Sequence, residues 1–192
     1  MLHRTIITAL ISSLLPIFAA CGGRLYKVAP LPASASPEIS TNNASGLNIG
    51  AVALDGEQSY ERFEANLPLA GVIAVDIKMV NKSDTTISTA SIKFDLRNSA
   101  GGLLKRLAPK KALSSVMKYY GNSYYAKAAY RRTLEDYESV ALKQESAIEP
   151  ERELRGIVFF QTKSETKSVE GLILSVAGLS APVNLQLQAA RN

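Results

Sequence analysis

Reactive side chains are scarce in this 192-residue chain, which has one cysteine, one histidine and no tryptophan. The single cysteine, Cys21, excludes an internal disulfide. The single histidine is His3, and we expect residues 1–20 to be removed as a signal peptide. The mature chain would then lack the imidazole base of Ser–His and Cys–His nucleophilic pairs and the ligands of common zinc sites. We therefore expect no metal and no cofactor, and of the hydrolases only a carboxylate-dependent one stays open.

The first 20 residues have the pattern of a secretory signal peptide. Arg4 gives a positive start, the stretch 6–18 is mostly apolar, and small residues follow it. This apolar run is shorter than the ~20 residues that a membrane-spanning helix needs. Cleavage after Gly22, as in an ordinary secreted protein, would leave the small residues Ala20 and Gly22 before the cut and is also compatible with the sequence.

The residues Phe18-Ala-Ala-Cys21 resemble the lipobox of bacterial lipoproteins, in which Leu is usual where this chain has Phe18. The resemblance implies that Cys21 becomes the first mature residue and carries a diacylglyceryl group through a thioether. Stable anchoring requires about two fatty chains, which such a group supplies. Gly22 stands where an aspartate would indicate retention in the inner membrane, so the resemblance favours the periplasmic face of the outer membrane.

The mature chain is expected to be one domain on a tether. Removing residues 1–20 leaves 172 residues and a net charge of 21 − 17 = +4, because Arg4 is lost. Residues 21–46 are rich in Pro, Ser, Asn and Gly, which predicts a lipidated N-terminus and a flexible tether of roughly 28 Å average span. The alternative for this stretch is that residues 25–31 form an edge strand.

Residues 47–192 are expected to form a mainly β domain. Apolar residues alternate with polar ones in the segments 47–54, 71–81, 91–98, 153–162, 170–178 and 183–190, and Tyr60–Asn66 is counted as a short seventh strand. Seven short strands without crossover helices predict an antiparallel two-sheet sandwich. The stretches VDIKMVNKSDTTI, FDLRNSAGG and ERELRGIVFF resemble immunoglobulin-like, telokin-like domains of bacterial lipoproteins. This resemblance implies a fold more than a function.

Residues 109–146 break the alternation and predict an inserted helical hairpin or one long kinked helix. Apolar residues recur there at helical spacing. Pro109 is expected to open the first helix, Gly121 to close it in a left-handed cap, and Asn122 or Ser123 to cap the next.

The helical insert also holds the residues that we expect to bind a partner. Six of the eight tyrosines lie in it, and nine basic residues without an acid occur between Arg97 and Leu134. The tyrosine rings either pack against the sheet or the other helix, with their hydroxyls in contact with water, or form an aromatic surface for a partner. The bases form either an ordinary solvated face or a patch facing anions. The candidate partner-binding residues are Tyr119, Tyr120, Tyr124, Tyr125, Lys127, Arg131 and Arg132.

From these features we expect a non-catalytic, membrane-anchored envelope lipoprotein that acts as an interaction or assembly module for an envelope protein. A lipoprotein that binds a glycan or a lipid is the alternative, and a carboxylate-dependent hydrolase is a weaker one. Nucleic acid is not an expected partner, because the sequence has no nucleic-acid recognition motif and no phosphate-binding glycine loop.

The replacement Cys21→Ser tests the anchor. We expect it to move the mature protein from the membrane fraction to the soluble fraction, because no other residue accepts the diacylglyceryl group. Mass spectrometry of the wild type should show a lipid adduct on Cys21. An unmodified sulfhydryl at this residue, or a native chain that begins upstream of it, would contradict the assignment.

Overall fold

The computed structural model describes residues 23–31, 46–122, 125, 127–143, 147–162, 164–166 and 168–187, together with the backbone of 40–42. Cys21, Tyr124 and residues 1–20, which we expect to be a signal peptide, lie outside the described residues. The elements are β1 (Ser40–Asn42), β2 (Leu47–Ala53), α2 (Gly56–Phe63), β3 (Val72–Asn81), β4 (Ile87–Ser88), β5 (Lys93–Arg97), β6 (Leu103–Leu107), α3 (Pro109–Tyr119), α4 (Lys127–Val140), β7 (Ala147–Ile148), β8 (Glu153–Gln161), β9 (Ile173–Ala177) and β10 (Val183–Gln186).

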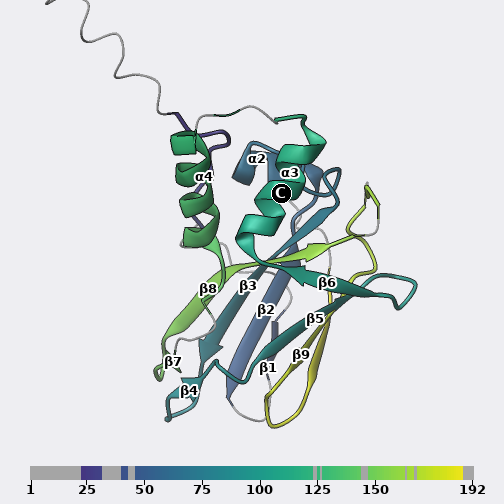
Figure 1. Cartoon of the computed structure of the whole chain (residues 1–192). Helices are drawn as coiled ribbons and strands as arrows, with labels where there is room; N and C mark the ends of the chain where they lie inside the picture. The colour runs from purple at the N-terminus through teal and green to yellow at the C-terminus, as the bar shows by residue number, and fades with distance from the viewer. Residues whose placement is uncertain are drawn as a thin grey trace, which may run out of the picture.

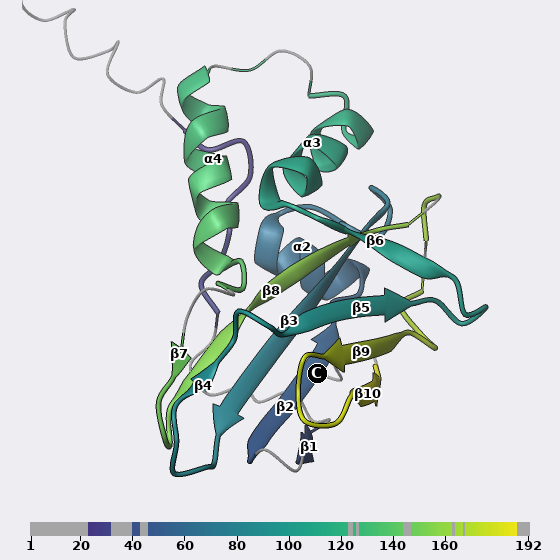
Figure 2. The same ribbon diagram turned by 60° about the horizontal axis from the view of Figure 1, so that its bottom comes forward.

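The molecule is mainly β, with one large antiparallel sheet in the order β1-β2-β3-β8-β6-β5-β9-β10 and a small pair β4-β7. The sheet curls into a nearly barrel-like shape, so that β5 and β9 cross in front of β2 and β3 (Figure 2). We expected two separate sheets. β6 joins the two halves, because its residues 105–107 pair with β8 and its residues 103–104 pair with β5.

The inside of the curled sheet holds the first of two hydrophobic cores. Alternate residues of β3 point into it, as the period-two pattern predicted: Ile73, Val75, Ile77 and Met79 are all buried there. Inward residues of β2, β5, β6, β8, β9 and β10 also belong to this core. Burial of one face of each strand therefore fixes the register of these strands.

The second core lies between the outer face of β3 and β8 and the three helices (Figure 1). At its centre the ring of Phe63 from α2 lies 5.0 Å from Tyr137 of α4 and 5.8 Å from Phe159 of β8. Asp76, a polar residue of the alternating segment 71–81, is buried and accepts two hydrogen bonds from Arg155, of 3.0 and 2.7 Å. The helices and the residues packed with them thus cover a face that the alternation pattern predicted to be polar.

The short strand expected at Tyr60–Asn66 is wrong, because this region belongs to α2 and the turn after it. Asp55 and Gln58 form a capping box at the start of the helix. The Gln58 N–H donates to the Asp55 carboxylate at 2.9 Å, and the Asp55 N–H donates to Gln58 Oε1 at 3.1 Å. A capping box satisfies two amides that the first helical turn leaves free, so this stretch is stable as a helix.

The predicted helical hairpin is present as α3 and α4. Pro109 is the first residue of α3, and Gly121 follows its end with a φ of 68°. The Asn122 N–H bonds Met117 O at 2.9 Å and the Gly121 N–H bonds Lys118 O at 3.3 Å, which is a Schellman motif. Asn122 does not cap the next helix, which begins five residues later, at Lys127. Ser123 lies outside the described residues.

Gly156 of β8 permits a close backbone contact. A Cβ at this position would lie 2.4 Å from the Leu142 Cα and 2.6 Å from the Leu142 N. We expect Gly156→Ala to lower the free energy of unfolding by about 1–3 kcal/mol, the usual range for overpacking. Equilibrium urea unfolding measures this. Gly23→Ala is the control, because a Cβ at residue 23 would have no atom within 4 Å. Equal stability of the two variants would contradict the contact.

Candidate functional site

The predicted partner-binding residues that the structure describes lie at one end of the helical hairpin. Tyr119 and Tyr120 stand at the end of α3, Tyr125 lies in the connection, and Lys127, Arg131 and Arg132 occupy the first two turns of α4. All six are exposed. Figure 1 shows the end of α3 and the start of α4 at the same end of the molecule, away from β4 and β7.

The three exposed tyrosines are held by contacts with other rings and with the backbone. Tyr119, Tyr120 and Tyr125 are 40%, 42% and 43% exposed. Tyr119 and Tyr120 meet edge to face with ring centroids 5.0 Å apart, and Tyr125 stacks on Tyr130 at 5.2 Å. The Tyr120 hydroxyl accepts a 2.9 Å hydrogen bond from the Asn66 N–H. These contacts therefore hold the three rings in place, and part of each ring remains exposed to solvent.

The sequence reasoning missed Lys118, an exposed base next to Tyr119 in the last turn of α3. We define the aromatic–basic surface by its six exposed members, which are Lys118, Tyr119, Tyr120, Tyr125, Lys127 and Arg131. Arg132 is also exposed but makes a further interaction within the protein. The first turn of α4 contains no acid, so its bases oppose the positive end of the helix dipole. An anion bound at this end of α4 would relieve that opposition.

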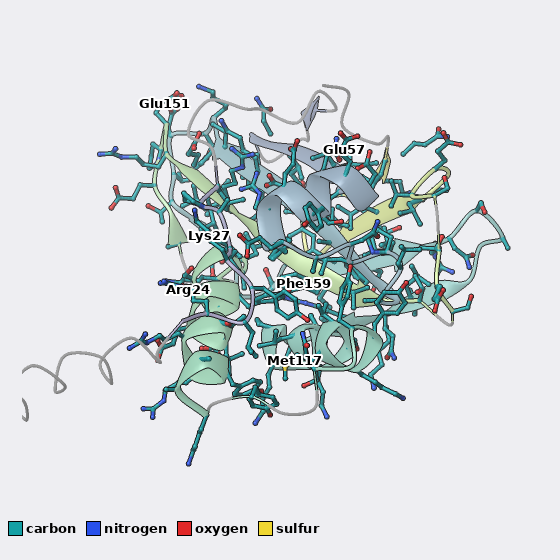
Figure 3. The ribbon with its side chains drawn as sticks, turned by 90° about the horizontal axis from the view of Figure 1, so that it is seen from above. Arg24, Lys27, Glu57, Met117, Glu151 and Phe159 are labelled. Atoms are coloured by element: carbon teal, nitrogen blue, oxygen red, sulfur yellow. The ribbon has the colours of Figure 1, made fainter. Side chains whose placement is uncertain are left out.

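Part of the expected tether is packed on the domain. Residues 24–31, which we call the N-terminal strap, run along α4 and α2, and Figure 3 shows Arg24 beside α4. Arg24 forms an ion pair with Asp136, whose hydrogen bond and charge raise the pKa of the guanidinium. The Leu25 N–H donates to Thr133 Oγ1 at 2.9 Å. The strap forms no strand, so neither description that we gave for residues 25–31 holds for it.

The middle of the strap enters the second core. Tyr26 is only 6% exposed, its hydroxyl accepts a hydrogen bond from the Asn122 side chain, and its ring lies 6.1 Å from Tyr120. Burial raises the pKa of the Tyr26 hydroxyl, and the bond from Asn122 partly offsets this. The strap thus connects the start of the described chain directly to the aromatic–basic surface.

The end of the strap is tied to α2 and the residue after it by hydrogen bonds that use the backbone of the strap. The Ala29 N–H donates to Arg62 O at 2.7 Å, and the Arg62 guanidinium donates to Pro30 O at 2.9 Å. The Lys27 N–H donates to the Glu64 carboxylate at 2.9 Å. Val28 and Leu31 pack against the second core. Because these bonds are distributed along its length, the strap is an integral part of the folded domain.

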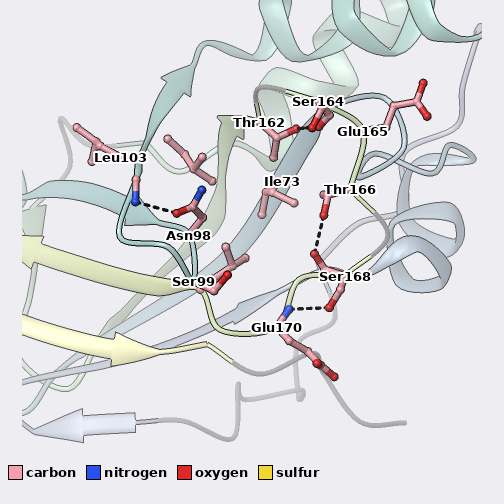
Figure 4. Close-up of a pocket in the computed structure, with 13 residues that line it drawn as sticks. Ile73, Asn98, Ser99, Leu103, Thr162, Ser164, Glu165, Thr166, Ser168 and Glu170 are labelled. Carbon is pink, nitrogen blue, oxygen red and sulfur yellow. Dashed lines mark hydrogen bonds between the residues drawn. The ribbon is translucent and has the colours of Figure 1, made fainter.

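A cavity of about 360 Å³ opens elsewhere, between the β5–β6 turn and the loop after β8 (Figure 4). Ile73, Leu103, Leu104 and Leu172 form its apolar part, and Glu165 and Glu170 also line it. Hydroxyl groups of the loop beside it form hydrogen bonds within the loop itself. For example, Thr166 Oγ1 donates to Ser168 O at 2.9 Å. No aromatic ring is among the described residues that line it, so it lacks the stacking platform expected of a glycan site.

Within the described ranges, no group of three or more His, Cys, Asp or Glu residues has the arrangement of a metal site. Among the same residues, no helix combines the length and apolar character needed to cross a bilayer.

Comparisons with known proteins give two distant structural neighbours. The yjhA protein from Bacillus subtilis is similar over 79% of this chain and 98% of its own, with 8% identity and a TM-score of 0.43. A conserved hypothetical protein from Bacillus anthracis is similar over 78% of this chain and 93% of its own, with 12% identity and a TM-score of 0.37. No protein-family model and no curated protein sequence matches the chain.

Replacing Tyr26 tests the strap. We expect Tyr26→Ala to lower the free energy of unfolding by about 3 kcal/mol, as for other buried aromatic residues. Tyr60→Ala is the matched control, because Tyr60 is 61% exposed and surface replacements usually change stability by less than about 0.5 kcal/mol. Urea unfolding of both variants gives the comparison. Little or no loss for Tyr26→Ala would mean that the strap is not part of the folded domain.

Proposed function

We propose that this protein is a lipid-anchored lipoprotein of the cell envelope that binds another envelope component, without catalysis, through its aromatic–basic surface. The single observation that supports this is the grouping of exposed, ordered tyrosines with exposed bases at one end of the helical hairpin. Tyrosine and arginine are enriched among residues that dominate binding energy. The anchor at Cys21 and the periplasmic face of the outer membrane remain parts of the proposal.

We also propose that the curled sheet is a variant of the immunoglobulin-like, telokin-like sandwich. The support is that β2, β3 and β8 on one side and β5, β9 and β10 on the other bury alternate residues in one shared core. β6 then serves as the connection that turns two sheets into one. On this view the sandwich is a scaffold, and the specific function belongs to the helices added to it.

Two alternatives, glycan binding and a carboxylate-dependent hydrolase, have less support. A glycan-binding role would use the tyrosines for stacking, and the cavity beside β8 is lined by loop hydroxyls and carboxylates, with no tyrosine among the described residues that line it. A carboxylate-dependent hydrolase would need two facing acids, and the candidates at that cavity, Glu165 and Glu170, are both exposed. The described residues that line this cavity include none of the predicted partner-binding residues.

A photo-reactive amino acid placed at the exposed Ala128 tests the proposed binding in intact cells. Such a probe captures both proteins and lipids. We expect adducts at Ala128 that fall at least about fivefold in the background Tyr125→Ser, Lys127→Gln, Arg131→Gln, because about 1 kcal/mol of lost binding corresponds to that factor.

The matched control background is Ile173→Ser, Lys93→Gln, Lys105→Gln. It also removes one exposed apolar side chain and two exposed bases, from the outer face of β9, β5 and β6. We expect it to leave the Ala128 adducts unchanged. A probe at Ala128 that captures no more than a probe at Lys93 would contradict the proposed surface.

A further inference from the structure

We propose that the aromatic–basic surface docks on the anionic headgroups of the same bilayer that holds the lipid anchor, so that the domain lies against the membrane by its helical end. This inference rests on the proposed function, because it takes the lipid on Cys21 as given. It names the bound component as the lipid surface. A protein partner on this surface is the competing outcome.

The first argument is where the chain leaves the fold. Leu25 is bonded to Thr133, which lies within two turns of the start of α4, and Arg24 is paired with Asp136. Arg24 is three positions after Cys21, and a fully extended chain covers at most about 3.6 Å per residue. The sulfur-bearing residue therefore lies within about 11 Å of the Arg24 Cα along the chain. A free tether of residues 22–46 would instead allow an average span of roughly 28 Å.

The second argument is that the residues near this point suit a lipid–water interface. Tyr119, Tyr120 and Tyr125 each keep about two-fifths of their surface exposed. Tyrosine rings are enriched at the headgroup level of membranes, where one end of the ring is apolar and the other is wet. This end of the molecule thus offers rings that need no further folding to enter the interface.

The third argument is charge complementarity. Lys118, Lys127 and Arg131 are exposed bases, whereas the first acid of α4 is Glu135, two turns after its start. Each base held near an anionic lipid surface strengthens partitioning by roughly fivefold. Anionic headgroups also relieve the opposition between these bases and the dipole of α4. The acids of α4 lie farther from the aromatic–basic surface, so the helix is polarised along its length.

The bilayer is favoured over a protein partner because the anchor brings it to this surface in every molecule. Once Cys21 is inserted, contact with the headgroups is an intramolecular event, and the short connection keeps its effective concentration high. A protein partner would have to enter the narrow space between this surface and the membrane.

Vesicle sedimentation of the mature full-length chain carrying Cys21→Ser tests the inference without the anchor. The probe is a vesicle of phosphatidylcholine with 30% phosphatidylglycerol (about one lipid in three anionic, chosen to give a strong surface potential). We expect binding to these vesicles, at least tenfold weaker binding to pure phosphatidylcholine, and weakening by 0.5 M salt, which screens charge to about 4 Å.

The same assay with the matched variants separates this surface from general basicity. Tyr125→Ser, Lys127→Gln, Arg131→Gln should lower partitioning at least tenfold, since two bases at roughly fivefold each are lost. Ile173→Ser, Lys93→Gln, Lys105→Gln, which removes as many charges, should change it less than twofold. Circular dichroism of each variant checks that it is folded. Equal loss in the two variants, or no binding to anionic vesicles, would overturn the inference.

Lipidated protein in the same vesicles gives a second measurement that does not depend on the affinity of the free domain. Backbone amides of residues 127–131 should exchange more slowly in anionic vesicles than in phosphatidylcholine vesicles, and those of β5 should not change. No difference would overturn headgroup docking. The proposed function would fail separately, if Cys21 carries no lipid or if a probe at Ala128 captures nothing in cells. A probe that captures only a protein would overturn this inference and leave the proposed function standing.

Discussion

The burial of Tyr26 between the helices is the constraint on which the rest of this account depends. It places residues 24–31 on α2 and α4, where backbone hydrogen bonds from Leu25 and Ala29 and the ion pair of Arg24 hold them. A residue only three positions before Arg24 then cannot be far from the helical hairpin. The same packing places the Tyr26 ring beside Tyr120, so the strap also supports the surface that we propose to bind headgroups.

The two hydrophobic cores stabilise different parts of the fold. The inner core closes the curled sheet on itself and is built from residues that alternate along each strand. The outer core joins the helices and the strap to β3 and β8 through the rings of Phe63, Tyr137 and Phe159. β3 and β8 belong to both, which explains why Asp76 on their outer face is buried and paired with Arg155. The hairpin therefore packs on two inner strands of the sheet.

Sequence patterns predicted the parts of this structure that local chemistry decides. Alternation along 72–81 identified the inward face of β3, and Pro109 and Gly121 marked the two ends of α3. The patterns failed where distant contacts decide. The stretch 23–31 is short and contains Pro30, so its local sequence does not distinguish a packed strap from a free tether. Only the second core between α2 and α4 provides the site in which Tyr26 is buried. β6, with the sequence LLKRL, has weak alternation and is held by its pairing with β8 and β5. Tyr119, Tyr125 and the bases of α4 were identified by composition, but their grouping beside the start of the chain required the fold.

Amide hydrogen exchange of the mature protein in solution, followed residue by residue, tests the central claim most directly. The strap residues Leu25 and Ala29 donate backbone hydrogen bonds to Thr133 of α4 and Arg62 of α2. Their amides should therefore exchange far more slowly than those of an unstructured chain. Replacement of Tyr26 by Ala should release both amides together while Ile77 in β3 stays protected. Unstructured-chain exchange rates at Leu25 and Ala29 in the wild type, with Ile77 still protected, would contradict the account, because the proposed lipid anchor would then be joined to the domain by a free tether.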